Sequence, residues 1–179
     1  VSMLISKKEI KVGEYLGIQR SPAQYRYRNK MEYTFGDTVK DGPLCLGMHR
    51  KKHFMSIVTV DECQLVPEDF NRILSAVLGF CQEKGYSFYH KKSHEGLLRH
   101  LIIRYGVRTG ELLVNIVTSS QGEFDDKGFT EMITALELDN RVVGVLRTVN
   151  DRLADAVYCE ELKVLWGRDY YMEKIMGLD

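Results

Sequence analysis

The 179-residue sequence lacks the short motifs that mark several large enzyme classes. It contains no G-x-G-x-x-G, no G-x-x-x-x-G-K-[ST], no H-E-x-x-H and no G-x-S-x-G. Nothing in it is therefore expected to hold a nucleotide cofactor or to form a serine hydrolase elbow. The string from His94 to Leu98 comes near to the zinc protease motif, but Leu98 stands where the second histidine belongs.

The chain also has little of what a membrane protein or a multidomain protein needs. Its longest uncharged stretch, Leu112 to Gly122, is too short to cross a bilayer. With only 3 prolines and no linker, repeat or low-complexity tract, we expect one domain over residues 1–179. No basic-then-apolar segment opens the sequence, so we expect a cytoplasmic protein with no membrane partner. The valine in first place indicates a fragment of a longer chain.

The four cysteines form no C-x-x-C pair, which argues against a self-contained zinc or redox site. Cys81 falls on the apolar face of a predicted helix and is expected in the core, while Cys45 is expected to be a small strand side chain. Cys159 precedes two glutamates, whose charges disfavour a thiolate. Cys63 lies in the connection between a strand and a helix, where it could be structural or a metal ligand.

A formal net charge of zero conceals a segregation of sign along the chain. Residues 1–54 hold 11 Lys and Arg against 5 Asp and Glu, and residues 55–111 hold 7 of each. Residues 112–179 hold 7 against 13. Such an asymmetry indicates a partner that reads one face, although a solvated surface with clustered charges would give the same counts.

The positive third also carries tyrosines between its cations. Lys and Arg neutralise phosphates, and tyrosine rings stack on unpaired bases. In an extended strand Arg26, Arg28 and Lys30 would share one face and Tyr25 and Tyr27 the other. A second basic run would lie at a hairpin tip nearby. We therefore predict nucleic-acid contacts at Arg20, Tyr25, Arg26, Tyr27, Arg28, Lys30, Arg50, Lys51 and Lys52. The alternative is that these charges protect a sheet edge or brace the sheet.

Two histidine pairs have the spacing of metal ligands on a helix, but their surroundings do not favour a metal. His49 and His53 enclose three cations, and His90 and His94 enclose two lysines. These charges would repel a metal ion, so phosphate contacts or surface roles fit better.

Short strand-like runs dominate the chain, with two helices between them. Strands are predicted over residues 25–35, 44–48, 53–60, 97–105, 111–118, 142–150 and 161–166. Pro67, two acidic residues and apolar residues at helical spacing predict a helix that ends at Gly85, and a second helix is predicted over 126–138. The order β-β-β-α-β-β-α-β-β predicts an α+β domain, a mainly antiparallel sheet with two helices on one face.

Several longer strings occur together in a fixed order from about Ser21 to Leu178. They are YRNKMEYTFG (27–36), LGMHRK (46–51), IVTVDECQL (57–65), GLLRHL (96–101), RYGVRTGE (104–111) and GRDY (167–170). In this order they resemble the bacterial RNA (uracil-C5)-methyltransferases, which make 5-methyluridine in 23S rRNA or tRNA.

The resemblance implies that this chain is the central RNA-binding domain of such an enzyme. Family members begin with an RNA-binding β-barrel and three close cysteines. They end in a Rossmann-type domain that binds S-adenosylmethionine and supplies the catalytic cysteine and an acidic base. We expect those parts to lie outside this chain, which would be inactive alone. By resemblance, Cys63 is the fourth ligand of a 4Fe-4S cluster in the parent, and since one thiolate cannot hold a cluster, no cofactor is expected in the fragment.

The resemblance implies RNA as the partner, with 23S rRNA expected and tRNA possible, together with the missing catalytic domain. The Arg28–Lys30 string would equally brace the cluster. Three alternatives remain: a free-standing RNA-binding or interaction module, a scaffold whose acidic C-terminal third docks another domain, and a thiol enzyme using Cys63 with His94 or His100. The acids beside Cys63 argue against the last.

Overall fold

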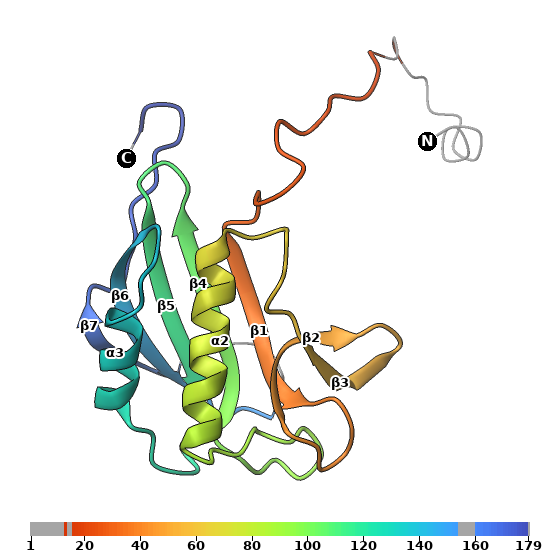
Figure 1. The fold of residues 1–179 in the computed structure, drawn as a ribbon, viewed down its shortest axis with the longest axis vertical. Helices are drawn as coiled ribbons and strands as arrows, with labels where there is room; N and C mark the ends of the chain where they lie inside the picture. The colour runs from red at the N-terminus through yellow and green to blue at the C-terminus, as the bar shows by residue number, and fades with distance from the viewer. Residues whose placement is uncertain (1–12, 14–15, 154–159, 179) are drawn as a thin grey trace.

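One sheet runs through the described part of the chain, with the strand order β3-β2-β1-β4-β5-β6-β7 (Figure 1). The computed structural model describes Gly13, residues 16–153 and residues 160–178, so that Cys159 lies outside the described residues. The strands are β1 (Lys30–Asp37), β2 (Leu44–Arg50), β3 (His53–Thr59), β4 (Leu98–Gly106), β5 (Glu111–Thr118), β6 (Arg141–Val149) and β7 (Glu161–Gly167).

The predicted α+β class is confirmed, and the sheet, which was predicted to be mainly antiparallel, is mixed. Five of its strand pairs are antiparallel, but β5 and β6 run parallel. The reason is the connection between them: the chain leaves β5 at Thr118, passes through a helix and returns to begin β6 at Arg141 beside Glu111. A crossover of this length through a helix delivers the next strand in the same direction.

Two helices, α2 (Glu68–Glu83) and α3 (Asp126–Thr134), cover one face of the sheet (Figure 1). The first begins after Pro67 with two acidic residues in its first turn, where the helix dipole favours negative charge. Gly85, with φ of +67°, follows its last turn. In α3 the Asp125 carboxylate accepts a hydrogen bond from the N–H of Gly128 at 2.8 Å and caps the helix.

The core lies between the helices and the sheet, and its members were largely predicted from helical and strand periodicity. Phe70, Ile73, Leu74, Val77 and Cys81 on α2 are all fully buried, which confirms the predicted apolar face. They pack with alternate residues of the central strands: Tyr33, Leu101, Ile103, Val114 and Ile116. Each fully buried apolar side chain of this size stabilises the fold by about 1.5–3 kcal/mol.

Both described ends of the chain lie at one end of the sheet. Residues 16–24 extend away from the end at which β1 begins, and residues 168–178 lie above the turn between β4 and β5 (Figure 1). Among the described residues, neither helix is long and apolar enough to cross a membrane.

Candidate nucleic-acid interface

The basic N-terminal segment, residues 19–29, does not form a strand, so the predicted alternation of its faces is wrong. Arg26 has φ of +55°, in the left-handed region, and β1 begins only at Lys30. Arg26 and Arg28 therefore do not share a strand face with Lys30. Tyr25 and Tyr27 remain 60% and 51% exposed, so both rings are open to a partner. Arg20 is exposed and belongs to residues 16–24, the segment that extends away from the sheet (Figure 1).

Main-chain hydrogen bonds hold this segment against the loop that contains Cys63. The N–H of Arg26 donates to the carbonyl of Gln64, and the N–H of Arg28 donates to that of Leu65, both at 2.9 Å. The carbonyl of Asn29 accepts from the N–H of Tyr105 at 2.8 Å. The main chain of the segment is thus held by the Cys63 loop and by β4, while Tyr25 and Tyr27 stay exposed.

The main chain of Cys63 is bound on both sides by one amide of α2. The N–H of Cys63 donates to Asn71 Oδ1 at 3.3 Å, and Asn71 Nδ2 donates to the carbonyl of Cys63 at 3.4 Å. Asn71 is buried, so this pairing fixes where the loop runs past the first turn of the helix.

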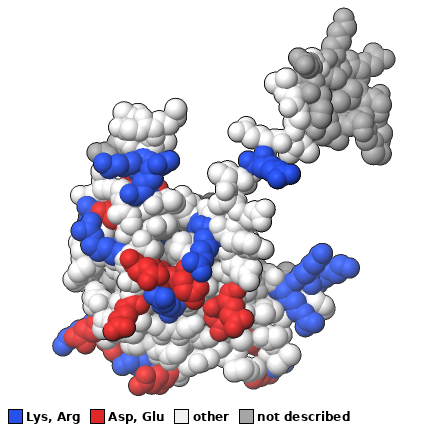
Figure 2. Space-filling view, turned by 45° about the horizontal axis from the view of Figure 1, so that its top comes forward, with Lys and Arg blue, Asp and Glu red and all other residues white. Residues whose placement is uncertain are grey.

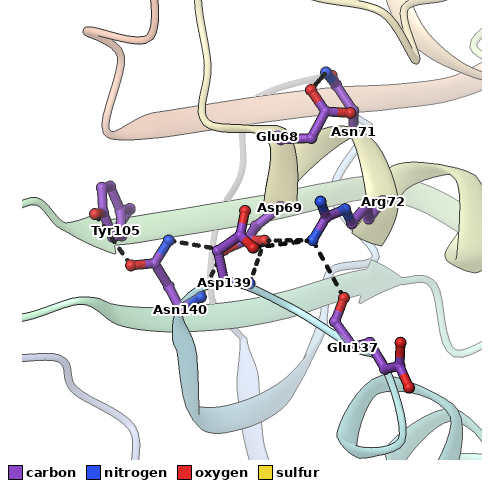
Figure 3. A network of polar contacts seen from close by, with 8 residues as sticks. All are labelled: Glu68, Asp69, Asn71, Arg72, Tyr105, Glu137, Asp139 and Asn140. Carbon is purple, nitrogen blue, oxygen red and sulfur yellow. Dashed lines mark hydrogen bonds and ion pairs between the residues drawn. The ribbon is translucent and has the colours of Figure 1, made fainter.

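The same helical turn is anchored to the rest of the fold by Asp69, which is fully buried (Figure 3). Its carboxylate accepts hydrogen bonds from the main-chain N–H groups of Asp139 and Asn140 and from Asn140 Nδ2, at 2.8–2.9 Å. Arg72 lies 3.6 Å from it, and Tyr105 donates to Asn140 at 3.2 Å. These bonds fix the start of α2, and with it the Cys63 loop, to the two residues that directly precede β6.

Cys63 offers one thiol in a hollow of about 700 Å³, lined also by Tyr25, Arg26 and the carboxylates of Asp61, Glu62 and Glu68. Within the described residues no group of three His, Cys, Asp or Glu side chains could hold a metal ion. Cys81 is buried on α2, where burial raises the pKa of its thiol to about 12. The donor set thus fits one ligand of a cluster, and any other ligands would come from elsewhere.

The buried hydroxyl of Tyr33 lies near Cys63. Burial raises the pKa of this hydroxyl well above its ordinary value, and the nearby charge of Cys63 raises it further. Among the described residues the hydroxyl has no hydrogen-bond partner.

The histidines proposed for a thiol enzyme have other neighbours. His94 Nδ1 lies 3.3 Å from the hydroxyl of Tyr89, and His100 Nδ1 lies 3.4 Å from that of Thr34. His100 and Thr34 face away from the side of the sheet to which Tyr33 points, because neighbouring strand residues alternate. In the described chain, neither ring lines the hollow around Cys63.

The second predicted basic group, Arg50, Lys51 and Lys52, lies at the tip of the hairpin between β2 and β3, as expected. All three side chains are exposed. In Figure 2 blue side chains stand out on the side where this hairpin projects, whereas red and blue mix over the body of the domain. Lys30 is less free, because it pairs with Glu32 at 3.4 Å. The structure therefore divides the predicted contacts into an N-terminal group and a hairpin group.

At the end of the sheet where β5 begins, Glu111 binds the C-terminal segment, residues 168–173. Its carboxylate accepts from the N–H of Met172 at 2.7 Å, from Arg141 at 2.9 Å and from Arg168. The bond from Met172 lowers the pKa of Glu111 below its ordinary value, and the two arginines lower it further. Glu173 accepts from the N–H groups of Val107 and Arg108 in the β4–β5 turn.

Comparison with known proteins gives matches along nearly the whole chain, although no protein-family model matches it. It is 49% identical to a protein named uncharacterized RNA methyltransferase from Caldanaerobacter subterraneus, over 99% of this chain and 39% of that protein. It is 46% identical to a protein of the same name from Clostridium tetani, over 98% of this chain and 38% of that one.

A solved structure shares the fold. It is the Pyrococcus abyssi tRNA (uracil-54, C5)-methyltransferase in complex with S-adenosyl-L-homocysteine, with a TM-score of 0.65 and 25% identity. The match covers 87% of this chain and 35% of that one. The chain thus spans about two fifths of the length of its curated relatives, and over almost all of its own length it is similar to proteins named RNA methyltransferases.

Proposed function

We propose that this chain is the RNA-binding central part of an S-adenosylmethionine-dependent methyltransferase that makes 5-methyluridine, with 23S rRNA as its substrate. The observation that carries the proposal is the similarity over 99% of the chain to an RNA methyltransferase. The uracil-C5 chemistry is supported by the solved structure with the same fold.

The residues of this chain would bind and orient RNA rather than perform the methyl transfer. Arg20, Arg26 and Arg28 would contact phosphates, and the exposed rings of Tyr25 and Tyr27 would stack on unpaired bases. The described part of the chain has one parallel β-α-β unit, and its β5–α3 connection contains a single glycine, Gly122, so this connection does not fit a dinucleotide-type turn. The methyl donor, which supplies the transferred methyl group, would therefore bind in another part of the longer protein.

The target uridine must leave the base stack for its C5 and C6 atoms to be reached. A domain that holds the flanking nucleotides would stabilise that extruded state. Cys63 would supply one of four thiolates to a cluster, with Asn71 fixing its loop and Tyr33 beside it.

The test uses the longer protein and RNA transcripts carrying tritium at uracil C5, because methylation at this carbon releases the tritium to water. We expect release with 23S rRNA and none with tRNA. Release with tRNA alone would contradict the assigned substrate, and methyl incorporation without tritium release would contradict the uracil-C5 chemistry.

RNA binding is tested on the chain itself with Arg20→Gln, Arg26→Gln and Arg28→Gln combined. We expect the slope of log Kobs against log salt concentration to become shallower by about 2, since each phosphate contact contributes about 0.7. An unchanged slope would remove these residues from the interface.

A further inference from the structure

A cleft of about 680 Å³ opens between the β2–β3 hairpin and the loop of residues 88–92. Residues 34–38, which are the second half of β1 and the residue after it, also line the cleft. The sequence separates the walls by about forty residues, so their proximity is a product of the fold.

Hydrogen bonds hold both walls in place, and these bonds do not use the lysine, methionine and phenylalanine side chains that line the cleft. On the hairpin side, Thr38 Oγ1 donates to the carbonyl of Ile57 at 2.8 Å, and Ser56 Oγ donates to the carbonyl of Thr38 at 2.7 Å. On the loop side, the N–H of Tyr89 donates to the carbonyl of Leu98 at 2.7 Å. The cleft is therefore preformed.

The charged side chains of the lining are almost all basic. Four lysines line it, Lys40, Lys52, Lys91 and Lys92, together with three histidines, against one acid, Asp37. The Asp37 carboxylate already accepts the N–H of Asp41 at 3.1 Å. An anionic ligand would thus meet a positive wall in a chain whose total formal charge is zero.

The inner wall of the cleft is apolar. Ile57 is buried, Met55 and Phe88 are half-buried, and all three line the space. A cleft that combines a cationic rim with an apolar and aromatic wall fits a ligand with both a phosphate and a flat ring.

We propose that this cleft binds an unpaired nucleotide of the RNA, with its phosphate at Lys52 and Lys92 and its base against Phe88 and Met55. The proposal rests on the proposed RNA-binding function and adds a contact site to it. A duplex would not fit in the same way, because its bases are stacked and closed to an apolar wall.

The cleft and the N-terminal group would contact different parts of one RNA. The N-terminal group precedes β1, whereas the cleft lies at the far end of that strand. Eight strand residues span about 26 Å, which is too far for one phosphate to reach both.

The experiment measures binding of the chain to a single-stranded oligouridylate over a salt series, with Lys52→Gln and Lys92→Gln combined. We expect the log–log salt slope to become shallower by about 1.4 and the affinity at low salt to fall about tenfold. Lys127→Gln with Lys163→Gln removes the same charge from α3 and β7 and should change neither value. The circular dichroism spectra of both double variants should match that of the unmodified chain.

Several results would overturn the assignment. An unchanged slope in the Lys52/Lys92 variant, while the Arg20/Arg26/Arg28 variant loses affinity, would refute the cleft and leave the proposed function intact. If the Lys52/Lys92 variant lost as much affinity for an RNA duplex as for the oligouridylate, the assignment to an unpaired nucleotide would be refuted. If the unmodified chain bound polyglutamate and the Lys52/Lys92 variant did not, the cleft would be assigned to an acidic protein partner instead. A chain that binds no RNA even at low salt would refute both proposals.

Discussion

Single side chains show how far local chemistry can be read from the sequence. Cys81 was predicted in the core from its position on the apolar face of a helix, and it is fully buried. Arg26 was predicted in a strand from the alternation around it, but its φ of +55° ends that pattern. The cause is not local: the N–H groups of Arg26 and Arg28 bind a loop almost forty residues away. Alternation cannot reveal such a partner.

Tyr33 gives a stability prediction at this scale. Its hydroxyl is buried without a hydrogen-bond partner among the described residues, which costs free energy in the folded state. We expect Tyr33→Phe to raise the free energy of unfolding by about 1 kcal/mol, measured by urea titration. Tyr105→Phe is the matched control, because the Tyr105 hydroxyl donates to Asn140 at 3.2 Å, and its removal should lower the free energy by a similar amount. A loss of stability in Tyr33→Phe would show that this hydroxyl has a partner.

Among the helices and strands, existence was predicted better than extent. Helix α3 ends at Thr134, although apolar spacing continues to Leu138. After it, the main chain of Asp139 and Asn140 turns toward Asp69 of α2, so a long-range bond overrides the local pattern. The parallel pairing of β5 and β6 follows from the helix between them once the two strands are known to be neighbours, but the sequence alone does not show that they are.

Asp69 provides the test of how α2 is fixed. Asp69→Ala removes the acceptor for three hydrogen bonds and leaves Arg72 without this partner. We expect the free energy of unfolding to fall by about 3 kcal/mol, seen as a lower urea midpoint with an unchanged slope. Asp139→Ala, which removes a carboxylate that is 69% exposed, should cost less than about 0.5 kcal/mol. Equal effects of the two changes would contradict the anchoring role.

At the scale of the whole molecule, the two predicted basic groups lie apart, one before β1 and the other at the tip of the β2–β3 hairpin. The hairpin tip was predicted correctly, and β3 of this hairpin is the edge strand of the sheet. Figure 2 shows basic side chains standing out on that side. The cleft that the hairpin forms with residues 88–92 was not predicted, because nothing in the sequence indicates which loops meet across β1. Assembly of a site from distant segments depends on strand order, which local patterns leave open.

The attachment of the C-terminal segment predicts an acid-sensitive fold. The pKa of Glu111 is lower in the folded protein than its ordinary value of 4.5, so its charged form favours folding. The stabilisation that Glu111 contributes is complete above pH 4.5, and it is lost as the pH falls through the lower pKa that Glu111 has in the folded protein. We expect stability in thermal melts to decline as the pH falls below about 5, and Glu111→Gln to flatten that decline. The same steep decline in Glu111→Gln would assign the acid sensitivity to other carboxylates.

The position of both described ends of the chain at one end of the sheet has a mechanical consequence. In the longer protein that we propose, a neighbouring domain joined at that end would leave the cleft at the opposite end of the sheet, about one strand length away. Such a body acts as a lever: a tilt of about 10° at the attachment would move the cleft by about 4–5 Å over a 26 Å arm. Small rotations against a neighbouring domain would therefore become large displacements of a nucleotide held in the cleft.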